Sequence, residues 1–124
     1  DNKKLGKEIR ELNAKIGGWP MDFDPFYGAP VILIVLANKN IPTHVYDGSL
    51  VMGNLMLAAD AVGFGSCWIH RAKEEFETEQ GKTWIKEWGL EGDWEGIGHL
   101  ALGYAKGAKP QPAPRKEGRI IVTK

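Results

Sequence analysis

Aliphatic residues near the start of the chain recur with the period of a helix. Four of them lie three or four positions apart among Lys, Glu and Arg: Leu5, Ile9, Leu12 and Ile16. This spacing places all four on one face of a helix. Asp1 or Asn2 can cap its first turn, and the glycine pair at 17–18 can end it. The pattern therefore predicts an amphipathic surface helix.

Three other stretches have the composition of β-strands. The run VILIVLA, residues 31–37, contains no polar residue and is rich in β-branched side chains, which is typical of an interior strand covered on both faces. SCWI, residues 66–69, and GIGHLALGY, residues 96–104, are two further apolar runs. Glycines in the last run indicate the close approach of another backbone. Helical and strand patterns together predict an α/β-type domain.

The segment SLVMGNLMLAADAVGF, residues 49–64, is apolar on almost every side of a helix. Such a helix is buried on most sides, so in a small domain it is either central or at a subunit interface. Asp47 or Ser49 is the expected N-cap. Gly63 falls where a helix ends in a left-handed residue, a conformation that glycine adopts without the Cβ penalty.

A third helical stretch covers residues 73–88, and we expect it to break near Gly81. Phe76, Ile85 and Trp88 share its apolar side and are predicted to be buried. The many Glu residues of this stretch are typical of a solvated helical face.

The C-terminal end combines stiff and apolar segments. Pro110, Pro112 and Pro114 precede the apolar sequence RIIVT, and such proline spacing favours extended backbone. We therefore expect residues 108–124 to form an arm that pairs with the edge of a sheet, including that of another subunit.

Composition narrows the class of protein. With 124 residues the chain, residues 1–124, forms a single domain. Sixteen basic and sixteen acidic residues cancel, so no overall field attracts nucleic acid or a membrane surface. No stretch reaches the ~20 apolar residues of a membrane-spanning helix. The single cysteine cannot form an internal disulfide and favours a reducing, cytoplasmic setting.

The stretch GFGSCWIHR, residues 63–71, combines glycines, a thiol and two basic side chains. Its glycines follow a predicted helix and precede a predicted strand, which reverses the order of a dinucleotide-binding loop. They are therefore more typical of a helix stop, with a loop that contacts a ligand as the alternative. Cys67 and His70 lie three residues apart, on opposite faces of a strand, so we expect Cys67 to be a buried structural thiol.

Histidines and basic residues elsewhere supply the remaining candidates. The three histidines are too scattered to show a metal-ligand spacing, so no metal site is expected. His99 is predicted to be a hydrogen-bonded strand histidine rather than a catalyst. Arg115, Lys116 and Arg119 can bind an anion by charge-assisted hydrogen bonds, and the alternative is a solvated tail.

Three segments resemble the nitroreductase family of FMN-dependent reductases in order and spacing: FYGAPVILIVLANKN, DGSLVMGNLMLAADAVGFGSCWIHR and GIGHLALGYAKGAKPQPAPRK. The resemblance extends from about Tyr27 to Lys116. It implies an α+β fold in which a mixed central sheet is flanked by helices, in an intertwined homodimer. In this family the C-terminal arm adds a strand to the partner's sheet, and FMN lies in two interfacial clefts.

The resemblance also implies which residues hold the cofactor. One segment matches the stretch whose backbone N–H groups approach flavin N5 and O4: Trp68, Ile69, His70 and Arg71. Arg115 and Lys116 match the cations that hold the FMN phosphate. The implied reaction is ping-pong, with NADH or NADPH reducing FMN before a nitroaromatic, quinone or similar acceptor is reduced. Because the flavin carries this chemistry, no side chain is expected to act as a catalytic acid or base.

One departure from the family pattern leaves two alternatives open. Family members begin with an Arg-rich segment that grips the FMN phosphate, followed by a loop that contacts the ring, and neither pattern occurs here. The resemblance thus implies that this sequence corresponds to the C-terminal two-thirds of the family fold. The alternatives are a flavin-dependent relative with dehalogenase-like chemistry and a non-catalytic dimeric module that lacks the cofactor.

Overall fold

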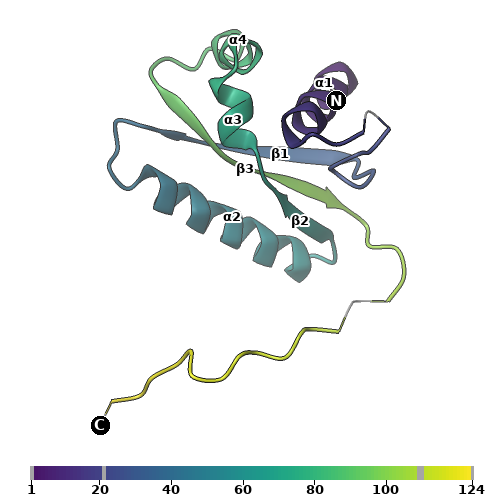
Figure 1. Cartoon of the computed structure of the whole chain (residues 1–124), viewed down its shortest axis with the longest axis vertical. Coiled ribbons are helices and arrows are strands. Elements are labelled where there is room, and N and C mark those ends of the chain that lie inside the picture. Colours follow the sequence, from purple (N-terminus) through teal and green to yellow (C-terminus); the bar gives the residue numbers. More distant parts are fainter. Residues whose placement is uncertain (1, 21, 109–110, 124) are drawn as a thin grey trace.

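Three strands form one sheet at the centre of the molecule. The computed structural model describes residues 2–20, 22–108 and 111–123. The strands are β1 (Val31–Asn38), β2 (Gly65–Ile69) and β3 (Trp94–Gly103), in the order β1-β3-β2, with β3 antiparallel to both neighbours. In Figure 1, α1 (Lys3–Gly17), α3 (Ala72–Glu77) and α4 (Glu79–Glu87) lie on one side of this sheet and α2 (His44–Ala61) lies on the other. The predicted α+β class is confirmed, but the sheet of the described strands is antiparallel throughout and not mixed as expected, because β3 runs against both of its neighbours. The homodimer stays a prediction.

The strand β1 was expected in the interior of the sheet, and this is wrong. Both of its faces pack against apolar clusters, as the uninterrupted apolar run predicts: Ile32 and Ile34 on the α1 side, Leu33 and Val35 on the α2 side. However, β1 is an edge strand, because β3 is its only partner among the described strands and β2 lies beyond β3. The outer edge of β1 thus presents backbone groups that no described strand pairs with.

The helix α1 has the predicted caps. The Asn2 side chain accepts a 3.0 Å hydrogen bond from the Leu5 N–H, and Gly18 ends the helix at φ +66°. Asp1, the other predicted cap, lies outside the described residues. Ile9, Asn13 and Ala14 form its buried face.

The helix α2 begins earlier than the sequence predicts and ends where it predicts. Thr43 is the N-cap instead of Asp47 or Ser49, because Asp47 already lies in the first turn and accepts a 2.8 Å hydrogen bond from the Thr43 hydroxyl. Gly63 follows the C-cap at φ +84°. The Phe64 N–H then donates a 2.8 Å hydrogen bond to the Ala59 carbonyl. This bond is typical of a Schellman motif, in which a left-handed glycine ends the helix.

Only one face of α2 is buried within the subunit. Gly48, Met52 and Ala59 face the sheet. Exposed large apolar residues lie on its opposite face (Tyr46, Leu50 and Leu57), on its flank (Val51) and at its two ends (Val45 and Val62). The expectation of a central helix is therefore wrong, and the alternative of a helix at a subunit interface stays a prediction.

The break between α3 and α4 lies at Thr78, three residues before the expected Gly81. Thr78 is extended, and its hydroxyl caps α4 by accepting a 3.0 Å hydrogen bond from the Gly81 N–H. Gly81 instead allows close packing, since a Cβ there would lie 2.5 Å from the Phe76 Cα. Trp84 fills the core at 4% exposure, whereas Trp88, expected to be buried, is 37% exposed.

The C-terminal arm leaves the body of the molecule after β3. Figure 1 shows its yellow end extended away from the sheet and helices. In residues 104–108 and 111–123 the structure contains neither helix nor strand, and these residues are exposed. Lys109, Pro110 and Lys124, part of the predicted arm, lie outside the described residues.

Candidate functional site

The end of β2 carries four of the six predicted site residues. Trp68 packs toward α2 in the cluster of Met52, while Ile69 is buried on the opposite face beside α3. His70 follows the strand and is exposed. Arg71 then turns the chain into α3, of which it is the N-cap. The alternation of the strand thus buries Ile69 and delivers the His70–Arg71 backbone to the surface.

Arg71 has an unusual backbone conformation. Its φ is +82°, in the left-handed region that residues with a Cβ rarely occupy. Holding a non-glycine residue there costs on the order of 1–3 kcal/mol, and such residues are enriched at functional sites. The Arg71 side chain lies beside the end of α1, since a Cβ on Gly17 would lie 3.1 Å from the Arg71 Nε.

A buried polar network lies directly beneath this turn. The Asn13 amide of α1 donates to the His70 carbonyl at 2.9 Å and also to the Glu75 carboxylate of α3. Glu75 in turn lies 2.8 Å from the His99 Nε2 of β3. The three side chains are 2%, 0% and 0% exposed, respectively. His99 is thus a hydrogen-bonded strand histidine, as predicted, although its Nδ1 has no hydrogen-bond partner among the described residues.

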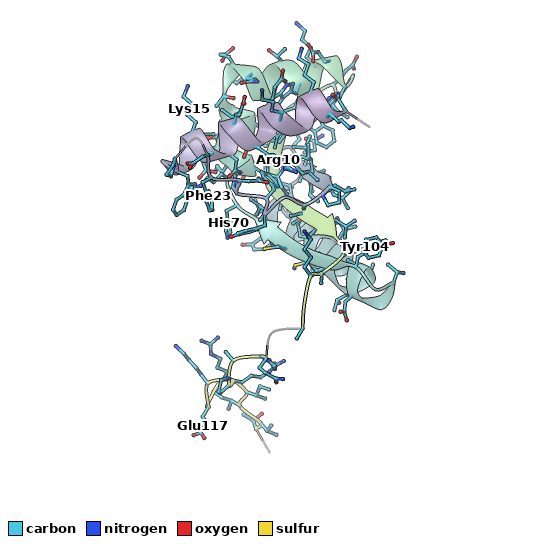
Figure 2. The ribbon with its side chains drawn as sticks, turned by 90° about the vertical axis from the view of Figure 1, so that its right-hand side faces the viewer. Arg10, Lys15, Phe23, His70, Tyr104 and Glu117 are labelled. Atoms are coloured by element: carbon cyan, nitrogen blue, oxygen red, sulfur yellow. The ribbon has the colours of Figure 1, made fainter. Side chains whose placement is uncertain are left out.

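Aromatic side chains of the loop between α1 and β1 border the same region. The ring centroids of Trp19 and Phe23 are 5.1 Å apart, and those of Phe23 and Tyr27 are 6.5 Å apart. All three rings are exposed, and Figure 2 shows Phe23 on the same side of the body as His70. Arg10 anchors the loop by donating a 2.5 Å hydrogen bond to the Ala29 carbonyl.

The two remaining predicted residues lie elsewhere. Arg115 and Lys116 are exposed on the arm, which Figure 2 shows below the body and away from His70. Neither residue forms an ion pair within the described part of the chain. One subunit therefore does not bring these cations together with the end of β2.

Cys67 is exposed, so the expectation of a buried thiol is wrong. Its strand is the other edge of the three-stranded sheet, and no described element covers the thiol. Within the described ranges, no group of three His, Cys, Asp or Glu side chains is placed to hold a metal ion. No helix among the described residues has the length and apolar character needed to cross a membrane.

Sequence reasoning missed Asn13 and Glu75. A signal for Asn13 was available, because it lies four residues after Ile9 on the face that the helical pattern marks as buried. A polar residue at such a position needs a buried partner. Glu75 gave no comparable signal, since it lies among several other acidic residues of the same stretch.

Comparisons with known proteins agree with this architecture. Residues 6–104 match the model of the nitroreductase family, whereas no curated protein sequence matches the chain. A nitroreductase with bound FMN from Bacteroides fragilis NCTC 9343 superimposes with a TM-score of 0.80 at 24% identity, over 98% of this chain and 70% of that chain. An FMN-dependent nitroreductase from Clostridium difficile R20291 gives 0.72 at 21% identity, over 96% and 74%. A second one from that organism gives 0.61 at 20% identity, over 87% and 62%.

Proposed function

The chain belongs to the nitroreductase family, and on this premise we propose that it is an FMN-dependent oxidoreductase that passes electrons from NADH or NADPH to small acceptors. Nitroaromatics, quinones and similar compounds are the proposed acceptor class. The observation that carries the proposal is the surface turn at Arg71, where a left-handed backbone follows directly on a buried strand.

The residues of this turn fit the edge of a flavin ring. A bound FMN would supply the redox chemistry, which is hydride transfer from the nicotinamide and reduction of the acceptor. The backbone of Trp68 to Arg71 supplies fixed N–H dipoles, which stabilise negative charge on the ring without reorganising. No side chain near the turn has to exchange a proton for this role.

The phosphate end of FMN needs cations that one subunit does not bring to this turn. Arg115 and Lys116 lie on an exposed arm that leaves the body. We infer that the arm reaches a second subunit and places both cations at its cofactor. Each charge-assisted hydrogen bond to the phosphate contributes on the order of 1.5–3 kcal/mol.

The open edge of β1 is the proposed docking place for the arm. Ile120, Ile121 and Val122 are 85%, 84% and 84% exposed, which is costly for an apolar segment that stays in solvent. An extended chain that adds to a free sheet edge satisfies the backbone groups of both strands. This exchange of arms gives the proposed intertwined homodimer.

The exposed apolar face of α2 supports the same assembly. Contiguous apolar patches of this kind mark protein–protein contacts. A twofold pair of subunits would cover both copies of the face at once. The proposed setting of the dimer is the cytoplasm, because the one cysteine of each chain has no disulfide partner within that chain.

A binding and reduction experiment tests the function. The purified protein is titrated with FMN, and binding is followed by quenching of flavin fluorescence. NADH and NADPH are then added separately under anaerobic conditions, where we expect the flavin absorbance to bleach. A nitroaromatic or a quinone should restore it. A protein that binds no FMN would contradict the proposal, and release of halide from a halogenated substrate would favour the dehalogenase-like alternative.

A further inference from the structure

The peptide group between His70 and Arg71 is held by a single buried side chain. The Asn13 amide donates to the His70 carbonyl at 2.9 Å, and Asn13 is only 2% exposed. That carbonyl therefore points into the protein, although the His70 side chain is exposed.

Because the peptide group is planar and trans, the orientation of the His70 carbonyl fixes the orientation of the Arg71 N–H. The carbonyl and the N–H of one trans peptide group point to opposite sides, and the described chain contains no cis peptide bond. With the His70 carbonyl turned inward, the Arg71 N–H is turned outward. Among the described residues it donates to no acceptor, so it is free to meet a ligand.

The remainder of the network keeps the Asn13 amide in place. The same amide group donates to Glu75, and Glu75 is fixed from its other oxygen by His99 at 2.8 Å. The three residues come from α1, α3 and β3, so one chain of hydrogen bonds ties together three elements. A buried carboxylate with these partners is costly to leave unpaired, and this cost locks the Asn13 side chain in one orientation.

We propose that Asn13 and Glu75 are positioning residues that aim the Arg71 N–H at the flavin ring, with His99 as their support. This inference rests on the proposed function, because it assigns the ligand of that N–H to FMN. Because the three side chains are buried, they would act on the ring only through the turn. The residues act by holding the strained turn at Arg71 in its left-handed conformation, which a free loop would leave.

The competing explanation is that the network serves only to stabilise the core. Two variants on the same helix face separate the two explanations. Asn13→Ala removes the donor to His70, whereas Ile9→Ala, one turn earlier and also 2% exposed, removes packing but no hydrogen bond to the turn. Both should lower the free energy of unfolding, so binding is measured where circular dichroism shows each variant to be folded.

We expect Asn13→Ala to raise the Kd for FMN at least about tenfold, the effect of losing one hydrogen bond to the ring. Its bound flavin should also have a more negative midpoint potential, because an N–H at the ring stabilises the electron-rich reduced form. Ile9→Ala should match the wild type in both measurements. Equal Kd values and potentials for Asn13→Ala and the wild type would overturn the proposal.

Conservative replacements provide the rescue test. Glu75→Gln keeps the shape and an oxygen that accepts from Asn13, so it should retain FMN affinity within about threefold, whereas Glu75→Ala should resemble Asn13→Ala. If Asn13→Ala does not fold, Asn13→Leu keeps the branched outline of the side chain, has a higher helix propensity and carries no donor. It should show the same loss. A Leu variant with wild-type affinity and potential would contradict the assignment.

A measurement without FMN separates this inference from the proposed function. The heteronuclear 15N NOE of the Arg71 amide reports its mobility in the ligand-free protein. We expect a lower value in Asn13→Ala than in the wild type or Ile9→Ala. If the wild type binds no FMN, but the NOE of Arg71 is still lower in Asn13→Ala than in the wild type, the proposed function is refuted and the role of Asn13 in holding the turn stands. An unchanged NOE would refute the positioning role.

Discussion

A single substitution on the outer face of α2 tests whether two subunits associate through it. Leu57 is 71% exposed in one subunit, and full burial of a leucine contributes about 1.5–3 kcal/mol. Covering the exposed part would therefore contribute roughly 1–2 kcal/mol per subunit. A twofold dimer contains the contact twice, which gives roughly 2–4 kcal/mol, or roughly a 30-fold to 700-fold effect on the dimer dissociation constant.

Leu57→Glu should weaken the dimer by at least this factor, because it also places a charge in the interface. Sedimentation velocity over a dilution series measures the dissociation constant. The helix content should not change, since the side chain is exposed in the subunit. Thr83→Glu is the matched control, because it adds the same charge on α4, on the opposite side of the sheet (Figure 1). A wild-type monomer at all concentrations, or equal dissociation constants for both variants, would refute the reasoning.

Three further predictions concern packing, the phosphate site and one ion pair. Gly81→Ala should lower the free energy of unfolding in urea by about 1–3 kcal/mol, since its Cβ would collide with the α3 backbone. Arg115→Ala should raise the Kd for FMN at least about tenfold by removing a charge-assisted bond. The Asp93 carboxylate, 2.9 Å from the Lys39 Nζ, raises the pKa of Lys39 above its ordinary 10.5. Any stability from this pair is therefore present below the unfolded pKa and lost as the pH rises through the folded one, and Asp93→Asn should lower the pKa of Lys39 in an NMR titration.

The packing prediction and the phosphate-site prediction each have a control on the same chain. Gly6→Ala, where a Cβ would have open space, should stabilise α1 by roughly 0.5–1 kcal/mol. Equal losses for Gly6→Ala and Gly81→Ala would contradict the packing argument. Lys106→Ala changes a cation near the start of the arm and should leave the Kd for FMN unchanged. An Arg115→Ala variant with wild-type affinity would remove the phosphate assignment.

The positions of most elements could be predicted because they depend on local patterns. The period of Leu5 to Ile16 defines α1, and Gly63 ends α2 because a left-handed residue is required there. The break at Thr78 was missed, because Thr78 and Gly81 lie three residues apart and either can mark the end of a helix in the sequence. Only the close packing of Gly81 against α3 shows that this glycine lies within a helix. The edge position of β1 was also missed. An apolar run indicates that both faces of a strand are buried, but it does not indicate whether a neighbouring strand pairs with each of its edges.

The candidate site, too, could be predicted from the sequence only in part. The sequence by itself determined the elements, the family resemblance and the segment Trp68 to Arg71. Only the tertiary structure showed that Asn13, Glu75 and His99 meet beneath that segment, since they come from three elements and lie up to 86 residues apart in the sequence. A periodic pattern shows which face of an element is buried, whereas the direction of one N–H depends on which partners the folded chain brings to it.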